Sequence, residues 1–298
     1  MSNQLITKSN ELIDASYRLS LNELRVVLYG ISLINPMNKD FPMEYKIEIS
    51  RFADLFGVDK NGLYSDIKAS IIKRFWQREF TYQLEDGKKR LGRWLDQIEY
   101  NDGDGYIKVF FSERVKPFLH KLQNNFTTYR IDQIAHFKSA NSVRIYEICI
   151  MNYNRYASAP SNQNRTSITF KITLEELKER LELTDKYQRF FDFNNRVLEV
   201  SKKEINRYSD ITIDYEIKKT GHHYEHITFK VKKKPTQNQN KQSLSKKIHE
   251  LEVKISEYHA GVNSLIAQRH EPYRLEQEEL LKNAIAELET VKNYIPKD

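Results

Sequence analysis

Apolar positions follow two different periods within residues 187–216, YQRFFDFNNRVLEVSKKEINRYSDITIDYE. In the first part they recur at three- and four-residue steps, which is the spacing of a helix that packs one face on a core. That face consists of Phe190, Phe193, Val197, Val200 and Ile205. In DITIDYEIKK the period is two, and a second run of this kind, YEHITFKVKKK, follows the turn TGHH. We therefore predict a helix that leads directly into a β-hairpin.

This order of elements occurs twice before residue 235. The second copy begins with a helix over 139–156, followed by the strand SITFKI, the short helix TLEELKERLEL, and the helix and hairpin described above. The first copy has a helix over 20–35, in which Ser20 and Glu23 form a capping box. It continues with the strand YKIEI, the short helix SRFADLFGV and a third helix over 62–76. The strands EFTYQL, RLGRWLDQIEY and YIKVFFS follow, with turns at EDGKKR and NDGDG.

Helix, strand, two short helices and a β-hairpin are the elements of a winged helix. This motif is a relative of the helix-turn-helix, in which the recognition helix enters the major groove of DNA. The sequence thus predicts an α+β protein with two tandem winged-helix domains, related as an internal pseudo-twofold repeat. Two unrelated α+β units with basic surfaces are the alternative.

The end of the chain differs from the rest in composition and periodicity. PTQNQNKQSLS, residues 235–245, begins with proline, is largely polar and lacks periodicity, so it is predicted to be a linker. Helical spacing of apolar residues then runs on both sides of HEP at 270–272, which predicts a helical hairpin or coiled-coil arm. The predicted domains are a first winged helix over 1–137, a second over 138–234, and a helical C-terminal arm over 246–298.

Charge is concentrated in the two predicted winged helices. The 298-residue chain has a formal net charge of +7, and residues 235–298 contain 9 basic and 10 acidic residues, so the remainder carries +8. This balance favours a polyanionic partner, although many basic proteins bind none. The single cysteine, Cys149, lies in the apolar run IYEICIMNY and is predicted to be a packed core residue. The chain has neither an apolar run of membrane length nor a signal-peptide pattern, so we expect a cytoplasmic protein without a membrane partner.

The outer face of the helix over 187–208 carries the candidate DNA-reading residues. Arginine pairs with both acceptors of guanine and asparagine pairs in the same way with adenine. Because the first residues of a recognition helix usually reach the bases, we assign base or near-base contact to this set: Lys186, Arg189, Asn195 and Arg196. Asn194, beside them, is a further DNA-binding candidate. Asn194 lies closer to the apolar face, and Asn206 is placed on the outer face. Lys202 and Lys203 are assigned to phosphate. The alternative is an ordinary solvated helix face, which Asp192 and Glu199 favour because carboxylates repel phosphate.

The first copy carries weaker candidates. Lys60 and Asn61 precede its third helix, where backbone amides favour phosphate, and Ser70 and Lys73 lie on the outer face of that helix. The turn EDGKKR, taken as the wing of this copy, places Lys88, Lys89 and Arg90 at a hairpin tip suited to phosphate or minor-groove contact. We expect the first domain to position the protein on DNA and the second to specify the sequence.

Three long segments resemble a known family. LITKSNELIDASYRLSLNELRVVLYGIS, FTTYRIDQIAHFKSANSVRIYEICI and FNNRVLEVSKKEINRYSDITIDYEIKKTG are similar to segments of the iteron-binding plasmid replication initiators, the twin winged-helix Rep proteins. The resemblance covers roughly residues 5–234. It implies bacterial proteins whose monomers bind repeated sites (iterons) at a plasmid origin, melt nearby DNA and recruit host replication proteins, including the host initiator and helicase. It also implies dimers, formed through the first winged helix and in equilibrium with monomers, that bind an operator inverted repeat and repress the initiator's own promoter.

The resemblance supports Arg196 and its neighbours as DNA readers, and it implies that Lys218 and Lys219 form a basic wing in the second domain. The wing tip TGHHYEH departs from the family because it is less basic than the usual turn. The arm beyond residue 245 lies outside the resemblance and is a candidate partner-binding or dimerising segment.

A metal-dependent nuclease is the main chemical alternative. Rolling-circle initiators hold a metal with two histidines separated by one bulky apolar residue and attack DNA with a tyrosine. In a strand, His222 and His226 would lie about 13 Å apart, too far to bind one metal with ligands near 2.1 Å. The sequence also lacks a GxxxxGK[ST] phosphate loop. We therefore expect no catalytic residues, metal or cofactor, and no enzymatic activity. A twin winged-helix transcription regulator without initiation activity is the second hypothesis, and the rolling-circle nuclease is the third.

Overall fold

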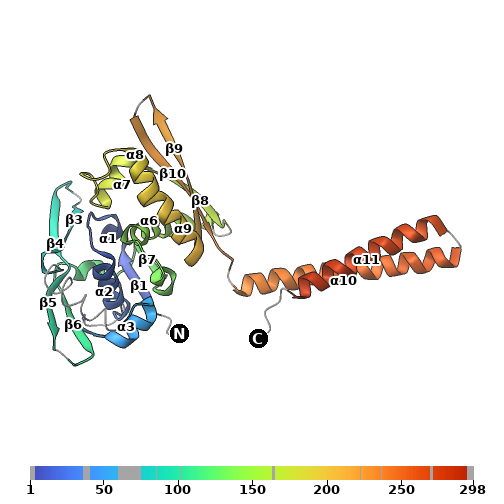
Figure 1. Cartoon of the computed structure of the whole chain (residues 1–298), viewed down its shortest axis with the longest axis horizontal. Coiled ribbons are helices and arrows are strands. Elements are labelled where there is room, and N and C mark those ends of the chain that lie inside the picture. The colour runs from blue at the N-terminus through green and yellow to red at the C-terminus, as the bar shows by residue number, and fades with distance from the viewer. Residues whose placement is uncertain are drawn as a thin grey trace. The chain divides into compact units, whose positions relative to one another are not determined.

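The computed structural model describes residues 4–35, 41–59, 75–84, 86–101, 103–162, 165–221, 223–235, 237–268 and 271–293. The chain forms two compact units, Met1–Lys234 and Pro235–Asp298 (Figure 1). The predicted domain boundary at residue 137 lies inside the first unit and stays a prediction. Most of the helix predicted over 62–76 lies outside the described residues. The same is true of four candidate DNA-binding residues: Lys60, Asn61, Ser70 and Lys73.

The first half of the first unit begins with a strand and two helices. Its elements are β1 (Leu5–Ser9), α1 (Asn10–Asp14), α2 (Leu21–Ser32), β2 (Glu44–Glu48), α3 (Ile49–Phe56), η2 (Phe75–Gln77), β3 (Glu79–Gln83), β4 (Lys89–Arg93), β5 (Leu95–Tyr100), β6 (Tyr106–Phe111) and η3 (Lys116–Phe118). The capping box predicted for α2 is confirmed. The Glu23 backbone N–H donates to Ser20 Oγ at 3.3 Å, and the Ser20 N–H donates to the Glu23 carboxylate at 2.6 Å.

The second half repeats this order. Its elements are β7 (Phe126–Arg130), α5 (Asp132–Ala135), α6 (Ala140–Ala157), η4 (Pro160–Asn162), β8 (Ser167–Thr173), α7 (Leu174–Arg180), α8 (Phe190–Phe193), η5 (Asn194–Leu198), α9 (Glu199–Tyr208), β9 (Ile211–Thr220) and β10 (His223–Lys233). Its sheet has the order β8-β10-β9, and the sheet of the first half has the matching order β2-β6-β5. Each half thus consists of a long helix, a strand, a shorter helix and a hairpin that returns to the first strand. This confirms the predicted repeat.

The strand order corrects the wing predicted for the first half. The hairpin that pairs with β2, as β9–β10 pairs with β8, is β5–β6, which turns at NDGDG rather than at EDGKKR. The hairpin that carries Lys88, Lys89 and Arg90 is β3–β4, which forms a separate two-stranded sheet. The run RLGRWLDQIEY, predicted as one strand, is divided between the two sheets at the fully buried Trp94. Both turns contain an Asp-Gly signal, so only the long-range pairing with β2 distinguishes the wing from the additional ribbon.

A buried polar cluster joins the two halves. β1 pairs antiparallel with β7, which brings Lys8 against α6. Lys8 Nζ lies 2.5 Å from the Glu147 carboxylate, and both side chains are fully buried. The Tyr129 hydroxyl donates to Glu147 at 2.5 Å, and the Arg144 guanidinium lies 3.3 Å from it and over the ring of Tyr17. Burial alone would raise the pKa of Glu147. The attraction of Lys8 and Arg144 to the carboxylate outweighs this effect, so the pKa lies below its ordinary value. The cluster holds the two halves in one arrangement.

The second unit is a helical hairpin of α10 (Gln237–Gln268) and α11 (Glu271–Asn293). Its helices bury Leu251, Val262, Ala284 and Val291 between them, as expected for the predicted helical arm. From Gln237 onward the predicted linker is helical, because this segment belongs to α10, and its role as a linker stays a prediction. Pro235 is the last proline before the hairpin turn, and the following Gln, Lys and Ser residues are compatible with helix. No helix within the described ranges has an apolar stretch long enough to span a membrane.

Candidate nucleic-acid interface

The recognition helix of the second winged helix runs continuously from Phe190 to Tyr208 through α8, η5 and α9 (Figure 1). Its middle segment, η5, is a π-helix rather than an α-helix. The predicted inner face is confirmed at Phe193, Val197 and Ile205, which are fully buried. Leu198, which was not named among the predicted inner-face residues, is also buried beside Val197. The π-turn changes the phase of the helix, so side chains before and after it do not follow one wheel.

Five of the residues predicted to contact DNA at this helix are exposed: Lys186, Arg189, Asn195, Arg196 and Lys203. Within the described part of the chain, the side chains of Arg196 and Lys203 make no hydrogen bond or ion pair. Lys186 is exposed in the loop before the helix. Arg189 caps the helix with its side chain 81% exposed, and its Nε lies 3.0 Å from Asp192. Such an exposed pair is weak and can exchange for a phosphate or a base edge.

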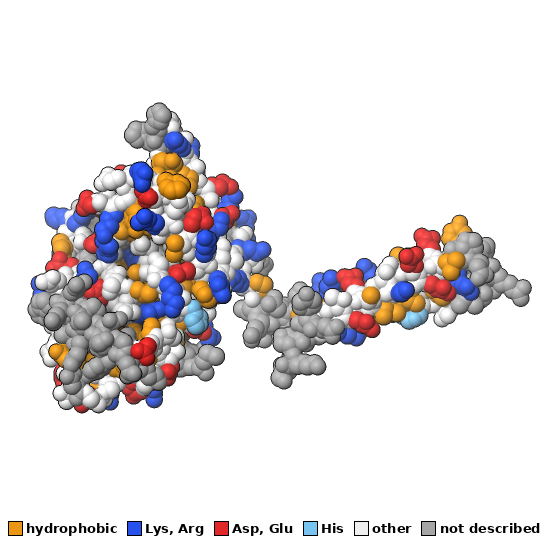
Figure 2. Space-filling view, in the orientation of Figure 1, with side chains coloured by type: hydrophobic (Ala, Val, Ile, Leu, Met, Phe, Trp, Pro, Cys, Tyr) orange, Lys and Arg blue, Asp and Glu red, His pale blue; other side chains and the backbone are white. Residues whose placement is uncertain are grey.

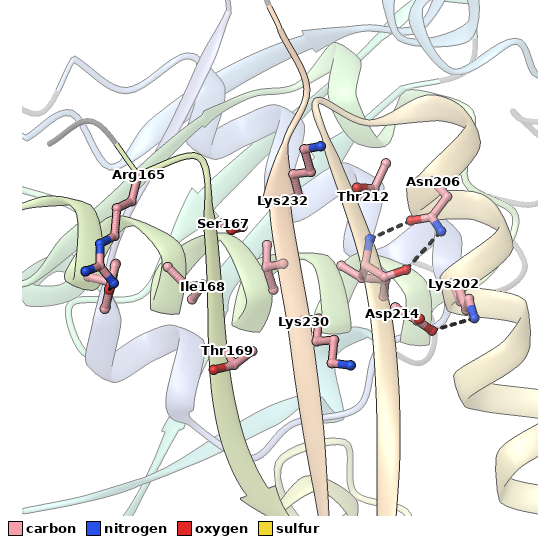
Figure 3. Close-up of a pocket in the computed structure, with 13 residues that line it drawn as sticks. Arg165, Ser167, Ile168, Thr169, Lys202, Asn206, Thr212, Asp214, Lys230 and Lys232 are labelled. Atoms are coloured by element: carbon pink, nitrogen blue, oxygen red, sulfur yellow. Dashed lines mark hydrogen bonds and ion pairs between the residues drawn. The ribbon is translucent and has the colours of Figure 1, made fainter. Parts of the chain in front are cut away.

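Lys202 is held by the wing strand. Its Nζ lies 2.7 Å from Asp214 of β9 (Figure 3). The same Nζ lies 5.6 Å from the ring centroid of Tyr215. The hydrogen bond between Lys202 and Asp214 raises the pKa of the lysine and lowers that of the aspartate. Asp214 therefore neutralises a cation that was predicted to contact phosphate, and Lys203 is the more available of the two lysines.

Two asparagines fix the recognition helix to β9. Asn206 was placed on the outer face, but its side chain accepts from the Ile213 N–H at 2.6 Å and donates to the Ile213 carbonyl at 2.9 Å (Figure 3). Asn194 accepts from the Tyr215 hydroxyl at 2.9 Å, and that hydroxyl also lies 2.5 Å from Glu199. Burial and the Glu199 carboxylate raise the pKa of Tyr215. These polar side chains point toward the strand that follows the helix, which a helical wheel alone does not reveal.

An open pocket of about 710 Å³ lies over the outer face of the second sheet beside α9. Lys202, Asn206 and Asp214 line one side of it, and Lys230 and Lys232 of β10 line another (Figure 3). Lys230 is ion-paired with Glu216 of β9. The pocket therefore continues the basic character of the helix onto the sheet, with carboxylates between the lysines.

The wing of the second domain, β9–β10, is attached to the start of the recognition helix. The rings of Phe190 and Tyr224 stack at 3.9 Å between centroids with an interplanar angle of 20°. Lys218 and Lys219 are exposed on this wing. Lys218 Nζ lies 3.5 Å from Glu225, and Lys219 Nζ lies 5.3 Å from the centroid of the Tyr224 ring. The wing and the beginning of the helix therefore form one surface with two exposed lysines.

The β3–β4 ribbon contacts the second domain instead of standing alone as a wing. Lys89 Nζ lies 2.6 Å from Glu179 of α7, and Lys88 Nζ lies 2.8 Å from Asp86. Arg90 is exposed. Lys89 thus forms an ion pair between the two halves, which its predicted position at a hairpin tip did not indicate.

Charge on this unit is mixed but rich in cations. Figure 2 shows Lys and Arg side chains distributed over one face of the unit, with Asp and Glu between them. Arg207, near the end of α9, is a further exposed cation, and its Cζ lies 5.1 Å from the centroid of the Tyr208 ring. It was not among the predicted DNA-binding residues, although its position on the recognition helix could have identified it. Among the residues that the structure describes, no group of three or more His, Cys, Asp or Glu is placed to hold a metal ion. The arrangement is suited to binding a polyanion.

Comparisons with known proteins agree with this geometry. Residues 5–150 match the family described as Initiator Replication protein, WH1, and residues 173–231 match the family described as Initiator Rep protein, WH2. A replication initiation protein of Escherichia coli is 24% identical over 219 residues, covering 72% of this chain and 65% of the relative. An uncharacterized 27.6 kDa protein of Escherichia coli is 21% identical over 228 residues, covering 72% of this chain and 90% of its own length.

A solved structure has the same fold. The crystal structure of Pi initiator protein in complex with iteron DNA matches 79% of this chain and 100% of its own, with a TM-score of 0.65 and 20% sequence identity. The match extends across both winged-helix halves, since it covers more of the chain than either half contains.

Proposed function

The chain belongs to the family of replication initiator (Rep) proteins with two winged-helix domains, and from this premise we propose that it binds double-stranded DNA sequence-specifically and initiates plasmid replication. Its targets would be iterons, the repeated sites of a plasmid origin, in the bacterial cytoplasm. The exposed and unpaired Arg196 and Lys203 on the recognition helix support this function most directly.

In the proposed complex, the recognition helix of the second domain lies in the major groove. Arg196 reads a base edge, because a guanidinium forms two parallel hydrogen bonds with guanine. Lys203, two turns further along the helix, contacts phosphate, and Lys218 and Lys219 of the wing contact the backbone beside the groove. Asn195 is placed to read an adjacent base. The first domain positions the protein on the same duplex.

In this proposal the junction between the two domains sets the spacing of their DNA-contacting surfaces. The buried cluster of Lys8, Arg144 and Glu147 joins them, and the exposed Lys89–Glu179 pair adds a second contact. Separation of the two halves would leave these buried charges without partners, which is costly, so the junction favours one arrangement. The distance between the two DNA-contacting surfaces is therefore held fixed, as simultaneous contact with one site requires.

The proposed activity is binding without catalysis. Melting of origin DNA is then driven by the free energy of protein–DNA contacts, and host proteins, including the host initiator and helicase, supply the enzymatic steps. We further propose that a dimer in equilibrium with the monomer binds an operator inverted repeat and represses the initiator's promoter. The C-terminal helical hairpin is a candidate for partner binding or dimerisation.

Two experiments test the proposal. Selection from random duplexes would recover one repeated motif if the protein is sequence-specific. A plasmid that carries this motif in a candidate origin would then replicate only in cells that supply the protein. A recovered motif with no support of replication would instead indicate a transcription regulator of the same architecture. Metal-dependent nicking with a covalent tyrosine–DNA product would indicate a nuclease.

A further inference from the structure

Phe191 has an unusual environment for a phenylalanine. Its side chain is 69% exposed, although both neighbouring phenylalanines are packed. Phe190 stacks on Tyr224 of the wing, and Phe193 is fully buried. Isolated exposed apolar residues are common on protein surfaces and do not by themselves indicate a binding site. The position of Phe191 in the recognition helix makes its exposure informative.

The π-turn explains how Phe191 comes to face outward. In an uninterrupted α-helix, residues seven positions apart lie on nearly the same face, so Phe191 and Leu198 would point in similar directions. Leu198 is 1% exposed and Phe191 is 69% exposed. The π-turn of η5, residues 194–198, lies between them and changes the phase of the helix. It lets the end of the helix bury Leu198 while the beginning turns Phe191 away from the core. π-turns of this kind are frequent at functional sites.

The first turn of the helix presents Phe191 together with polar DNA-reading groups. Arg189 precedes it, and Asn195 is exposed one turn later. The Arg189–Asp192 pair spans Phe191, and the stack of Phe190 on Tyr224 anchors the adjacent residue. These contacts hold the residues on either side of Phe191, whose phenyl ring is an exposed apolar group within a polar and cationic surface. A major groove offers one apolar group at its base edges, which is the 5-methyl group of thymine.

We propose that Phe191 contacts the 5-methyl group of a thymine in the DNA site and so contributes to sequence specificity; this inference rests on the proposed function. Arg196 and Asn195 would contact hydrogen-bonding groups of the base edges, whereas Phe191 contacts the thymine methyl, which neither donates nor accepts a hydrogen bond. Cytosine lacks the methyl group at this position, so Phe191 discriminates a T·A pair from a C·G pair.

The test uses the full-length protein and a labelled duplex that carries the sequence recovered by selection from random DNA. Each thymine of the duplex is replaced in turn by uracil, which lacks only the 5-methyl group. At one position the wild-type affinity should fall about fourfold, which corresponds to the roughly 0.8 kcal/mol of one buried methyl-sized group. For Phe191→Ala, the thymine and uracil duplexes should bind equally at that position.

Arg196→Ala is the matched control, because it should weaken binding while the fourfold thymine preference remains. The thermal unfolding of Phe191→Ala should equal that of the wild type, since the side chain is exposed. The inference is overturned if the wild type binds the selected site but tolerates uracil everywhere, or if Phe191→Ala retains the preference. A protein that selects no sequence at all would overturn the proposed function and this inference together, and the selection step reveals that outcome before any uracil duplex is used.

Discussion

Arg196 and Lys203 allow the proposed mode of DNA binding to be tested with two matched substitutions. Both side chains are exposed on one helix, and neither is paired within the described residues. Replacement by alanine therefore breaks no interaction in the free protein, and the measured loss belongs to the complex. A bidentate arginine–base contact is worth about 1–3 kcal/mol, so Arg196→Ala should reduce affinity for the specific site roughly 5- to 160-fold. Affinity for a scrambled duplex should change much less.

Lys203→Ala should behave differently because a phosphate contact carries no sequence information. It should weaken specific and scrambled duplexes by similar factors. One fewer neutralised phosphate should also reduce the slope of log K against log salt by about 0.9.

Fluorescence anisotropy with both duplexes, across a series of salt concentrations, measures both quantities. Circular dichroism melting of each variant checks that the fold is unchanged. An equal loss on specific and scrambled DNA for Arg196→Ala would show that Arg196 does not read bases. A salt slope unchanged by Lys203→Ala would remove that lysine from the phosphate contacts.

Further predictions concern the buried cluster and the wing strand. Glu147→Gln should destabilise the first unit by about 3–5 kcal/mol in urea unfolding, because it leaves two buried cations without their carboxylate. Glu225→Gln on the exposed wing is the control and should cost less than about 1 kcal/mol. Equal costs would contradict the assigned role of the cluster. The folded-state pKa of Glu147 lies below its ordinary value of 4.5. The stability that the Glu147 carboxylate contributes should therefore be complete above pH 4.5 and decline as the pH falls through the folded-state pKa. The Glu147→Gln variant should lack this part of the acid dependence of stability. Asp214→Asn should release Lys202 for phosphate contact, so it should strengthen binding to any duplex and steepen the salt slope by about 0.9; a weaker binder would show that the pair instead orients the wing.

Periodicity and local signals were sufficient to predict the repeated domains. The capping box of α2 needs only Ser20 and Glu23, three positions apart in sequence, and the inner face of the recognition helix needs only its apolar spacing. The order of helices and hairpins then identified the winged helix. The resemblance to the initiator family rests on longer segments and agrees with the family match.

The parts that sequence did not predict depend on contacts between distant segments. Two Asp-Gly turns in the first half look alike, and only the pairing of β6 with β2 identifies the wing. The β1–β7 ribbon joins segments about 120 residues apart, and its buried Lys8 could not be distinguished from a surface lysine. Lys202 and Asn206 were placed on an outer face because a helical wheel contains neither the π-turn nor the strand that packs beside the helix.

Selection of bound duplexes from a random pool, at about 0.15 M salt, shows whether the two winged helices read a DNA sequence. We expect recovery of one repeated motif of roughly two helical turns, because two winged helices held at a fixed distance contact successive major grooves. Recovery of no motif, with affinity that collapses as salt rises, would contradict it. Such a result would mean that the basic surface binds phosphate alone and that the recognition helix reads no sequence.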